Sequence, residues 1–122
     1  MKLDREQVLE RFLTYCGENP QQAGEARQAL WEALCHQCAQ WVETAAGPRA
    51  DQWEEALISL AAAKAFYQLT LADGALAPEA LTAGEVKIDW AGREQKARAL
   101  AEEQQRLCGP ALLSQEFYCK GV

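Results

Sequence analysis

The sequence has few of the residues that enzymes use for acid–base chemistry, and His36 is its one histidine among 122 residues. A single imidazole severely limits triad and proton-transfer mechanisms. The chain also lacks the phosphate-binding patterns G-x-G-x-x-G and G-x-x-x-x-G-K, and no serine or cysteine stands in a nucleophile-elbow context. Adjacent carboxylates such as Glu102 and Glu103 do not face each other on a helix. These absences predict a protein that is not an enzyme and requires no cofactor.

Long hydrophobic runs are also missing. No stretch approaches the ~20 uncharged apolar residues of a membrane span, and the N-terminus is charged from Lys2 onward, unlike a secretory signal. With 12 Lys and Arg against 18 Asp and Glu, the net charge of −6 disfavours an electrostatic nucleic-acid-binding surface. The five cysteines are an odd set, which favours reduced thiols over a disulfide framework. We expect a soluble, acidic, intracellular protein without membrane contact.

Helical periodicity dominates what is present. A chain of this length buries roughly two-thirds of its surface on folding, so we predict one domain over residues 1–122. Turn residues divide it into four helical segments, at about 4–16, 20–46, 51–72 and 93–108. Asp4 suits an N-terminal cap for the first and Gly17 a left-handed C-terminal cap, while Asn19 and Pro20 suit the start of the second. The fold class predicted is mainly α, a small bundle of about four helices.

The third segment is apolar nearly all round, which predicts a central helix buried on several sides. Its alanines allow neighbouring helices to approach closely. Lys64 interrupts this segment and has two interpretations. A desolvated lysine with a lowered pKa is a catalytic candidate, whereas a lysine that extends its stem along apolar surface keeps its amine in water. Trp31, Trp41 and Trp53 are predicted to lie mostly in the core.

Cys35, His36 and Cys38 form the one cluster of soft-metal ligands in the sequence. A redox C-x-x-C pair is expected at a helix N-terminus, but this pair falls within a helical segment, on its apolar stripe. A second ligand pair is missing, because the remaining cysteines are isolated. We therefore expect two buried cysteines and an exposed histidine, with a metal site as the weaker interpretation.

A short segment before the fourth helix changes period. Within residues 82–91, the sequence Val-Lys-Ile-Asp-Trp at 86–90 alternates apolar and charged side chains, which predicts one short β element. A lone strand leaves its backbone groups unpaired, and Pro78 makes residues 76–78 a poor partner. We therefore expect edge addition to another molecule, which closes into a ring when the rotation between subunits permits. Trp90 either anchors such an interface or packs on its own chain.

The order of these segments resembles a known family. An alanine-rich helix with Ala63-Lys64-Ala65-Phe66-Tyr67 is followed by Thr82-Ala83-Gly84-Glu85-Val86-Lys87-Ile88, by a charged alanine-rich helix, and by a C-terminal tail over residues 114–122 that contains Phe117-Tyr118-Cys119-Lys120-Gly121-Val122. From about residue 51 onward the chain is similar to the head–tail connector (adaptor, head-completion) proteins of phages and prophages. The helix with Cys35 and Cys38 departs from that pattern.

The resemblance implies a structural protein that assembles as a ring between portal and tail during virion assembly. Its partners would be further copies of itself and the portal and tail proteins, with DNA only as passing cargo. An acidic protein suits such a channel because it does not retain the sliding DNA. The expected location is the cytoplasm of the bacterial host and the virion. The contact between copies is expected to comprise Val86, Lys87, Ile88, Trp90, Arg98, Phe117 and Tyr118.

Two other interpretations stay open. A small helical adaptor or regulator would bind one partner protein in a groove and would bury the 86–90 segment within its own fold. A zinc or redox protein would instead act through Cys35 and Cys38, with His36 as a further candidate ligand.

Overall fold

The computed structural model describes residues 2–76 and 84–112, and within α3 and α4 it describes the side chains up to residue 73 and from residue 92. Four α-helices form the described part of the fold: α1 (Arg5–Cys16), α2 (Glu25–Ala45), α3 (Glu54–Leu76) and α4 (Gly84–Leu107). Two short 3₁₀ helices, η1 (Ala50–Trp53) and η2 (Gly109–Ala111), precede α3 and follow α4. The prediction of a mainly helical bundle is confirmed. No helix in the described parts of the chain has both the length and the apolar character that a membrane crossing requires.

Helix α1 has the ends that its sequence predicts. The Asp4 side chain accepts a hydrogen bond of 2.9 Å from the Glu6 backbone N–H at the N-terminus. At the other end Gly17 takes a φ of 70°, and its N–H donates to the Leu13 carbonyl at 2.9 Å. Glycine adopts this left-handed conformation without the steric cost that a Cβ atom brings. Val8 and Phe12 are the buried residues of this helix.

The predicted start of the second helix is wrong by about five residues. Asn19 caps a turn, where its side chain accepts from the Gln21 N–H at 2.9 Å and its carbonyl from the Gln22 N–H at 3.1 Å. The chain then becomes extended at Gly24, with φ −74° and ψ 168°, and α2 begins only at Glu25. A capping side chain stabilises an isolated turn as well as a helix, so the Asn-Pro signal does not distinguish the two.

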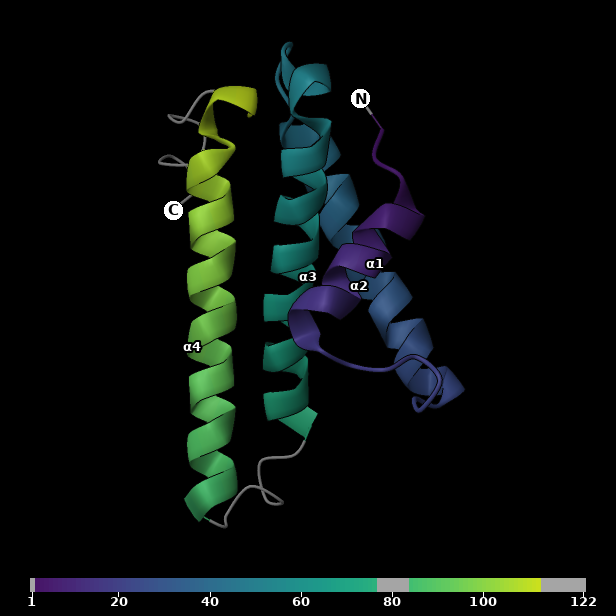
Figure 1. The fold of residues 1–122 in the computed structure, drawn as a ribbon, viewed down its shortest axis with the longest axis vertical. Helices are drawn as coiled ribbons and strands as arrows, with labels where there is room; N and C mark the ends of the chain where they lie inside the picture. Colours follow the sequence, from purple (N-terminus) through teal and green to yellow (C-terminus); the bar gives the residue numbers. More distant parts are fainter. Residues whose placement is uncertain (1, 77–83, 113–122) are drawn as a thin grey trace.

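Helix α3 is central, as predicted, because it packs against α1, α2 and α4 (Figure 1). It lies between α4 on one side and the pair α1 and α2 on the other. Its alanines carry no side chain beyond Cβ, so each neighbouring helix can approach closely. The fully buried residues of α3 include Leu57, Ile58, Leu60, Ala61, Ala62, Ala63, Ala65 and Leu69.

The predicted β element is wrong, because residues 84–90 form the first two turns of α4. A five-residue alternation also places positions 86 and 90 four residues apart, which is the spacing of one helix face. The alternation is therefore ambiguous, and the helix-forming sequence that follows extends the helix backward. The predicted start of the fourth helix at about residue 93 leaves Gly92 outside it, whereas the structure places Gly92 inside α4. Edge addition by a strand in this segment consequently has no structural basis.

Backbone hydrogen bonds connect the segment after α4 to the segment after α2. α4 ends at Leu107, close to the predicted end at about residue 108, and Gly109 and Pro110 begin η2. The Gly47 N–H then donates to the Ala111 carbonyl at 2.8 Å, and Ala46 and Leu112 form an isolated antiparallel bridge. A side chain at Gly47 would approach the Leu112 carbonyl oxygen to 3.3 Å, so this close crossing favours glycine. The predicted tail at 114–122 lies outside the described residues.

Candidate functional site

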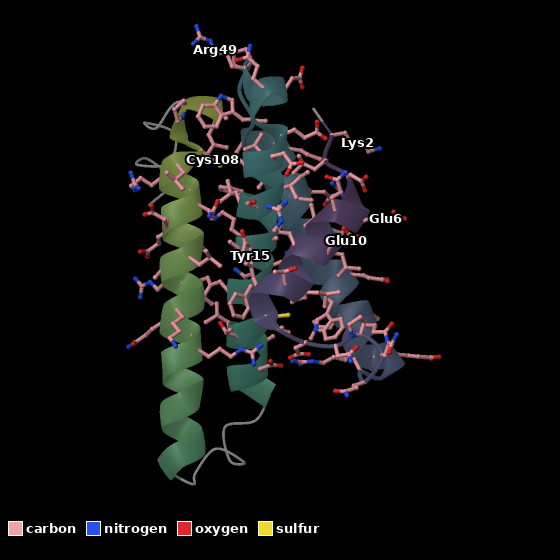
Figure 2. All side chains as sticks on the ribbon, in the orientation of Figure 1. Lys2, Glu6, Glu10, Tyr15, Arg49 and Cys108 are labelled. Atoms are coloured by element: carbon pink, nitrogen blue, oxygen red, sulfur yellow. The ribbon has the colours of Figure 1, made fainter. Side chains whose placement is uncertain are left out.

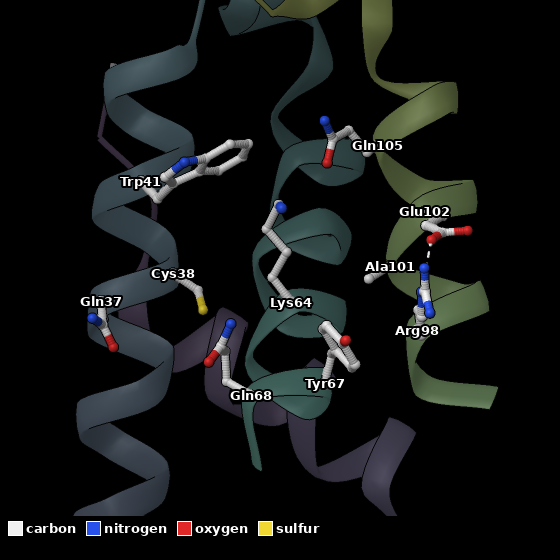
Figure 3. A pocket seen from close by; sticks show the side chains of 10 residues that line it. All are labelled: Gln37, Cys38, Trp41, Lys64, Tyr67, Gln68, Arg98, Ala101, Glu102 and Gln105. Atoms are coloured by element: carbon white, nitrogen blue, oxygen red, sulfur yellow. Dashed lines mark hydrogen bonds and ion pairs between the residues drawn. The ribbon is translucent and has the colours of Figure 1, made fainter. Parts of the chain in front are cut away.

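A groove of about 360 Å³ lies between α2, α3 and α4 (Figure 3). It forms because α4 packs along α3 but makes few or no contacts with α2, so that α3 provides the floor. Ligand sites for small molecules span about 300–1,000 Å³, and this groove falls at the lower end. All three helices contribute to its lining, which consists of Gln37, Cys38, Trp41, Lys64, Tyr67, Gln68, Arg98, Ala101, Glu102 and Gln105.

Lys64 enters this groove from the central helix. Its neighbours Ala63 and Ala65 are fully buried, whereas the Lys64 side chain is half-buried and extends toward Trp41 (Figure 3). The Nζ atom lies 4.0 Å from the centroid of the Trp41 ring, which is a cation–π contact. Burial lowers the pKa of Lys64, because the charged amine loses part of its hydration. Both sequence interpretations thus describe part of the site: the stem runs along apolar surface, and the amine is partly desolvated.

Lys64 forms no ion pair with a carboxylate in the described residues. A charge pair on the rim joins Arg98 to Glu102, whose Nε and Oε1 atoms lie 3.1 Å apart. Both side chains are about two-thirds exposed, at 67% and 68%, so this pair contributes little to stability. Among the described residues of the lining, Glu102 is the one carboxylate, and it already has a partner. The amine of Lys64 therefore keeps the capacity to receive one anion.

Amide side chains make up most of the remaining polar surface of the groove. Gln37, Gln68 and Gln105 come from α2, α3 and α4, respectively, and each offers both donors and an acceptor. Side chains of this kind can hydrogen-bond the backbone of a polypeptide. Together with one cation and an aromatic surface, they are suited to binding a short peptide segment.

The cysteine pair on α2 is buried, as predicted, with Cys35 at 1% and Cys38 at 7% exposure. Burial raises the pKa of Cys35 to about 12 and that of Cys38 to about 11, so both thiols stay protonated at neutral pH. Protonated thiols are poor nucleophiles and poor metal ligands. His36 is exposed, and its Nδ1 accepts a hydrogen bond of 3.1 Å from Arg5 Nε. Within the described residues, His, Cys, Asp and Glu form no group of three that could hold a metal.

Two ion-pair networks that the sequence does not reveal fix the ends of α2 (Figure 2 shows all described side chains). At its start, Arg27 donates to both Asp73 oxygens at 2.5 and 2.9 Å and to Glu18 at 2.9 Å. Toward its end, Glu43 accepts from Arg5 at 2.7 and 3.1 Å and from a backbone N–H of the N-terminal segment at 2.6 Å. The Arg5 guanidinium lowers the pKa of Glu43. The partners lie up to 46 residues apart, so sequence spacing gives no signal for them.

Of the residues expected at an interface between copies, Arg98 is exposed on α4 and borders the groove. The backbone positions of Val86, Lys87, Ile88 and Trp90 all fall on α4, while their side chains lie outside the description. Phe117 and Tyr118 also lie outside it. Within a straight helix Trp90 and Arg98 are separated by about 12 Å along the axis. Assignment of these residues to an interface therefore stays a prediction.

Trp41 is the clearest residue that sequence analysis misplaced. It follows the apolar stripe of α2, which predicted a core position, but 37% of it is exposed beside the groove. Trp31, by contrast, is 2% exposed and packs 6.2 Å from Phe12. Trp41 is exposed and Trp31 is buried because α4 does not pack against α2 beside Trp41. The periodicity of the α2 sequence gives no information about this packing.

Comparison of the chain with protein-family models, with curated proteins and with solved structures finds no match.

Proposed function

We propose that the protein is a non-catalytic assembly protein that binds other proteins along α4. The observation that carries this proposal is the small part of α4 that the bundle covers. Among the described side chains of α4, from residue 92 to residue 107, only Ala97 and Ala101 are buried. Over residues 92–107, α4 packs chiefly against α3, and most of the described side chains there stay available to a partner.

The outer surface of α4 has both charge and apolar area. Glu103 and Arg106 form an exposed pair at 2.5 Å, and Leu107 is 47% exposed beside them. Exposed ion pairs add little to the stability of the monomer, so these charges are available for a partner's surface. Charged groups across an interface contribute most to specificity and to the rate of association. Such a surface is suited to docking in one orientation.

Within this class we propose the role of a phage or prophage head–tail connector, located in the host cytoplasm and the virion. Two observations support this role. The first is the family resemblance of residues 63–67 and 82–88, and the second is that the latter motif continues into α4, the helix with the exposed described surface. Because the 84–90 segment is helical, contact between copies would use helix packing rather than strand pairing. Portal and tail proteins would be the other partners, and DNA would pass only as cargo.

The decisive experiment measures assembly with the portal protein encoded in the same genome. Size-exclusion chromatography with light scattering would compare the full-length chain with Trp90→Ala and with Gln95→Ala, an exposed position on the same helix. The connector role predicts a ring-sized complex that Trp90→Ala weakens and Gln95→Ala leaves intact. A complex with the same mass for all three proteins contradicts the assignment of Trp90, and no complex with portal or tail proteins contradicts the role.

A second candidate is a small helical adaptor or regulator that receives one partner in the groove. The observation that favours it is the half-buried amine of Lys64 over the Trp41 ring. The same light-scattering measurement separates the two proposals, since an adaptor forms a complex of fixed, low stoichiometry instead of a ring. Binding by the adaptor should also fall in Lys64→Met, which leaves the surface of α4 intact.

A further inference from the structure

Lys64 differs from the other partly buried cations of this protein. Among the described side chains, four further cations are partly buried, and each has a carboxylate oxygen between 2.5 and 3.7 Å from a guanidinium nitrogen: Arg5, Arg11, Arg27 and Arg93. Lys64 is half-buried on the central helix, yet no described carboxylate forms an ion pair with it. Burial of a charge is costly unless an opposite charge accompanies it. A ligand that brings a carboxylate would therefore complete the Lys64 site.

The contact with Trp41 does not replace such a partner. The ring attracts the Lys64 amine, whose Nζ atom lies 4.0 Å from the ring centroid, but it carries no net charge. An ammonium group has three N–H donors, and the ring lies on one side of it. Donors on the other sides can reach a ligand in the groove.

The charge of the groove also favours an anion. Its described lining contains two cations, Lys64 and Arg98, and one carboxylate, Glu102, whereas the whole chain has a net charge of −6. The described lining is thus a locally positive surface on an acidic protein. Glu102 would repel a second carboxylate placed close to it, because like charges disfavour each other across an interface. This arrangement favours a ligand with one carboxylate over a polyanion.

The remaining side chains of the lining suit a peptide better than a free anion. The amides of Gln37, Gln68 and Gln105 come from three different helices and can pair with the N–H and C=O groups of a peptide backbone (Figure 3). Tyr67 and Ala101 add apolar surface for side chains that flank the carboxylate. A peptide segment would use both kinds of surface, whereas a free anion would use neither.

We propose that the groove binds a segment of a partner protein in which one Asp or Glu lies between apolar residues, with that carboxylate on the Lys64 amine. The proposal rests on the adaptor role and gives the partner of the adaptor a defined chemistry. Lys64 would select the acidic residue, and the three glutamines would hold the backbone of the segment. Arg98 would face the segment from α4.

The test begins with a library of random short peptides in mRNA display, where no peptide has a free C-terminal carboxylate. Parallel selections use the unmodified full-length protein and Lys64→Met. We expect the first selection, but not the second, to enrich peptides with one Asp or Glu between apolar residues. Enriched peptides that lack an acidic residue overturn the proposal. If Gln68→Trp, which fills the groove, still blocks such peptides, the adaptor role stands, whereas a selection that enriches no peptide contradicts that role as well.

Fluorescence anisotropy then measures the affinity of one enriched, labelled peptide. Lys64→Met should weaken binding by about 10-fold, the effect of losing one charge-assisted hydrogen bond, and Lys64→Arg should weaken it less because the charge is kept. Replacing the acidic residue of the peptide by its amide should cause the same loss, and both changes together should cost no more than either alone. Lys96→Met is the matched control, since it removes the same charge from an exposed position outside the lining and should leave the affinity unchanged. Equal weakening by Lys64→Met and Lys96→Met, or additive losses from Lys64→Met and the amide peptide, would refute the assigned contact.

Discussion

Substitution of Gly92 by alanine tests whether α4 is continuous through the position where the sequence suggests a break. Gly92 is the ninth residue of α4, and a Cβ atom added there has no heavy atom within 4 Å. Glycine within a helix is less favourable than alanine by about 0.5–1 kcal/mol, because its backbone loses more conformational freedom on folding. With no clash to offset this gain, we expect Gly92→Ala to stabilise the protein by that amount. For a chain of this length the melting temperature should rise by about 2–5 °C.

The matched control makes the same chemical change at a glycine with the opposite requirement. Gly17 has a φ of 70°, where a Cβ atom costs about 1–2 kcal/mol. Gly17→Ala should therefore destabilise the protein, while Gly92→Ala stabilises it. Urea and thermal unfolding followed by far-ultraviolet circular dichroism measure both changes on one scale. A loss of stability in Gly92→Ala would show that residue 92 is not helical, and the strand interpretation of the preceding residues would regain its basis.

Further predictions concern the ion pairs at the two ends of α2 and the two buried cysteines of this helix. Arg27→Met should reduce the free energy of unfolding by about 1–2 kcal/mol in denaturant titrations, since it removes four charged hydrogen bonds, two to Asp73 and two to Glu18, in a partly exposed site. The pKa of Glu43 is lowered in the folded state, so its contribution to stability is present above the unfolded pKa and is lost as the pH falls through the folded pKa. Glu43→Gln should accordingly flatten the acid side of the stability profile below about pH 4.5. Thiol titration with a disulfide reagent at pH 8 should modify Cys35 and Cys38 in the native protein far more slowly than in urea, because their raised pKa values and burial leave little accessible thiolate. Fast native reaction of both thiols would contradict their placement in the core.

The sequence predicted correctly those features of the fold that depend on residues close together in the chain. Asp4 and Gly17 set the ends of α1 through hydrogen bonds within a few residues, and both ends are where the sequence places them. The uniform apolar character of α3 likewise required burial on several sides, whichever helices provide it. These features need no knowledge of distant residues. The same holds for the end of α4 at Gly109 and Pro110.

The start of α4 could not be predicted in this way, because a short alternating segment satisfies two periodicities. Val86 and Trp90 share a face in a helix of 3.6 residues per turn as well as in a strand of period two. Gly92 then appeared to separate this segment from the helix that follows. A glycine costs a long helix only about 1 kcal/mol, which the favourable residues on either side readily outweigh. The alternation was therefore the weaker evidence.

The sequence pointed to single residues of the candidate site but did not predict that they lie together. Lys64 was noticed as a charge in an apolar helix, and Arg98 was expected at a surface. Lys64 and Arg98 line a groove because α2 and α4 lie apart, on either side of α3. That separation is a property of packing between helices distant in the sequence. It also explains why Trp41, on a regular apolar stripe, is partly exposed.

Replacement of the strand by a helix changes what assembly through this region requires. A strand added to an edge gains a row of backbone hydrogen bonds, whereas two helices gain only what their side chains bury. Helix α4 is about 36 Å long and about 10–12 Å wide, so the outer half of its accessible surface is about 700–850 Å². A stable interface of standard size buries about 800 Å² on each partner, so only complete coverage of that outer half would suffice. A neighbouring helix covers only a stripe of it, and a stable ring would therefore need either further surface from each copy or a platform that holds the copies together. For a connector that platform would be the portal, and assembly of copies only in its presence is what the geometry of α4 leads us to expect.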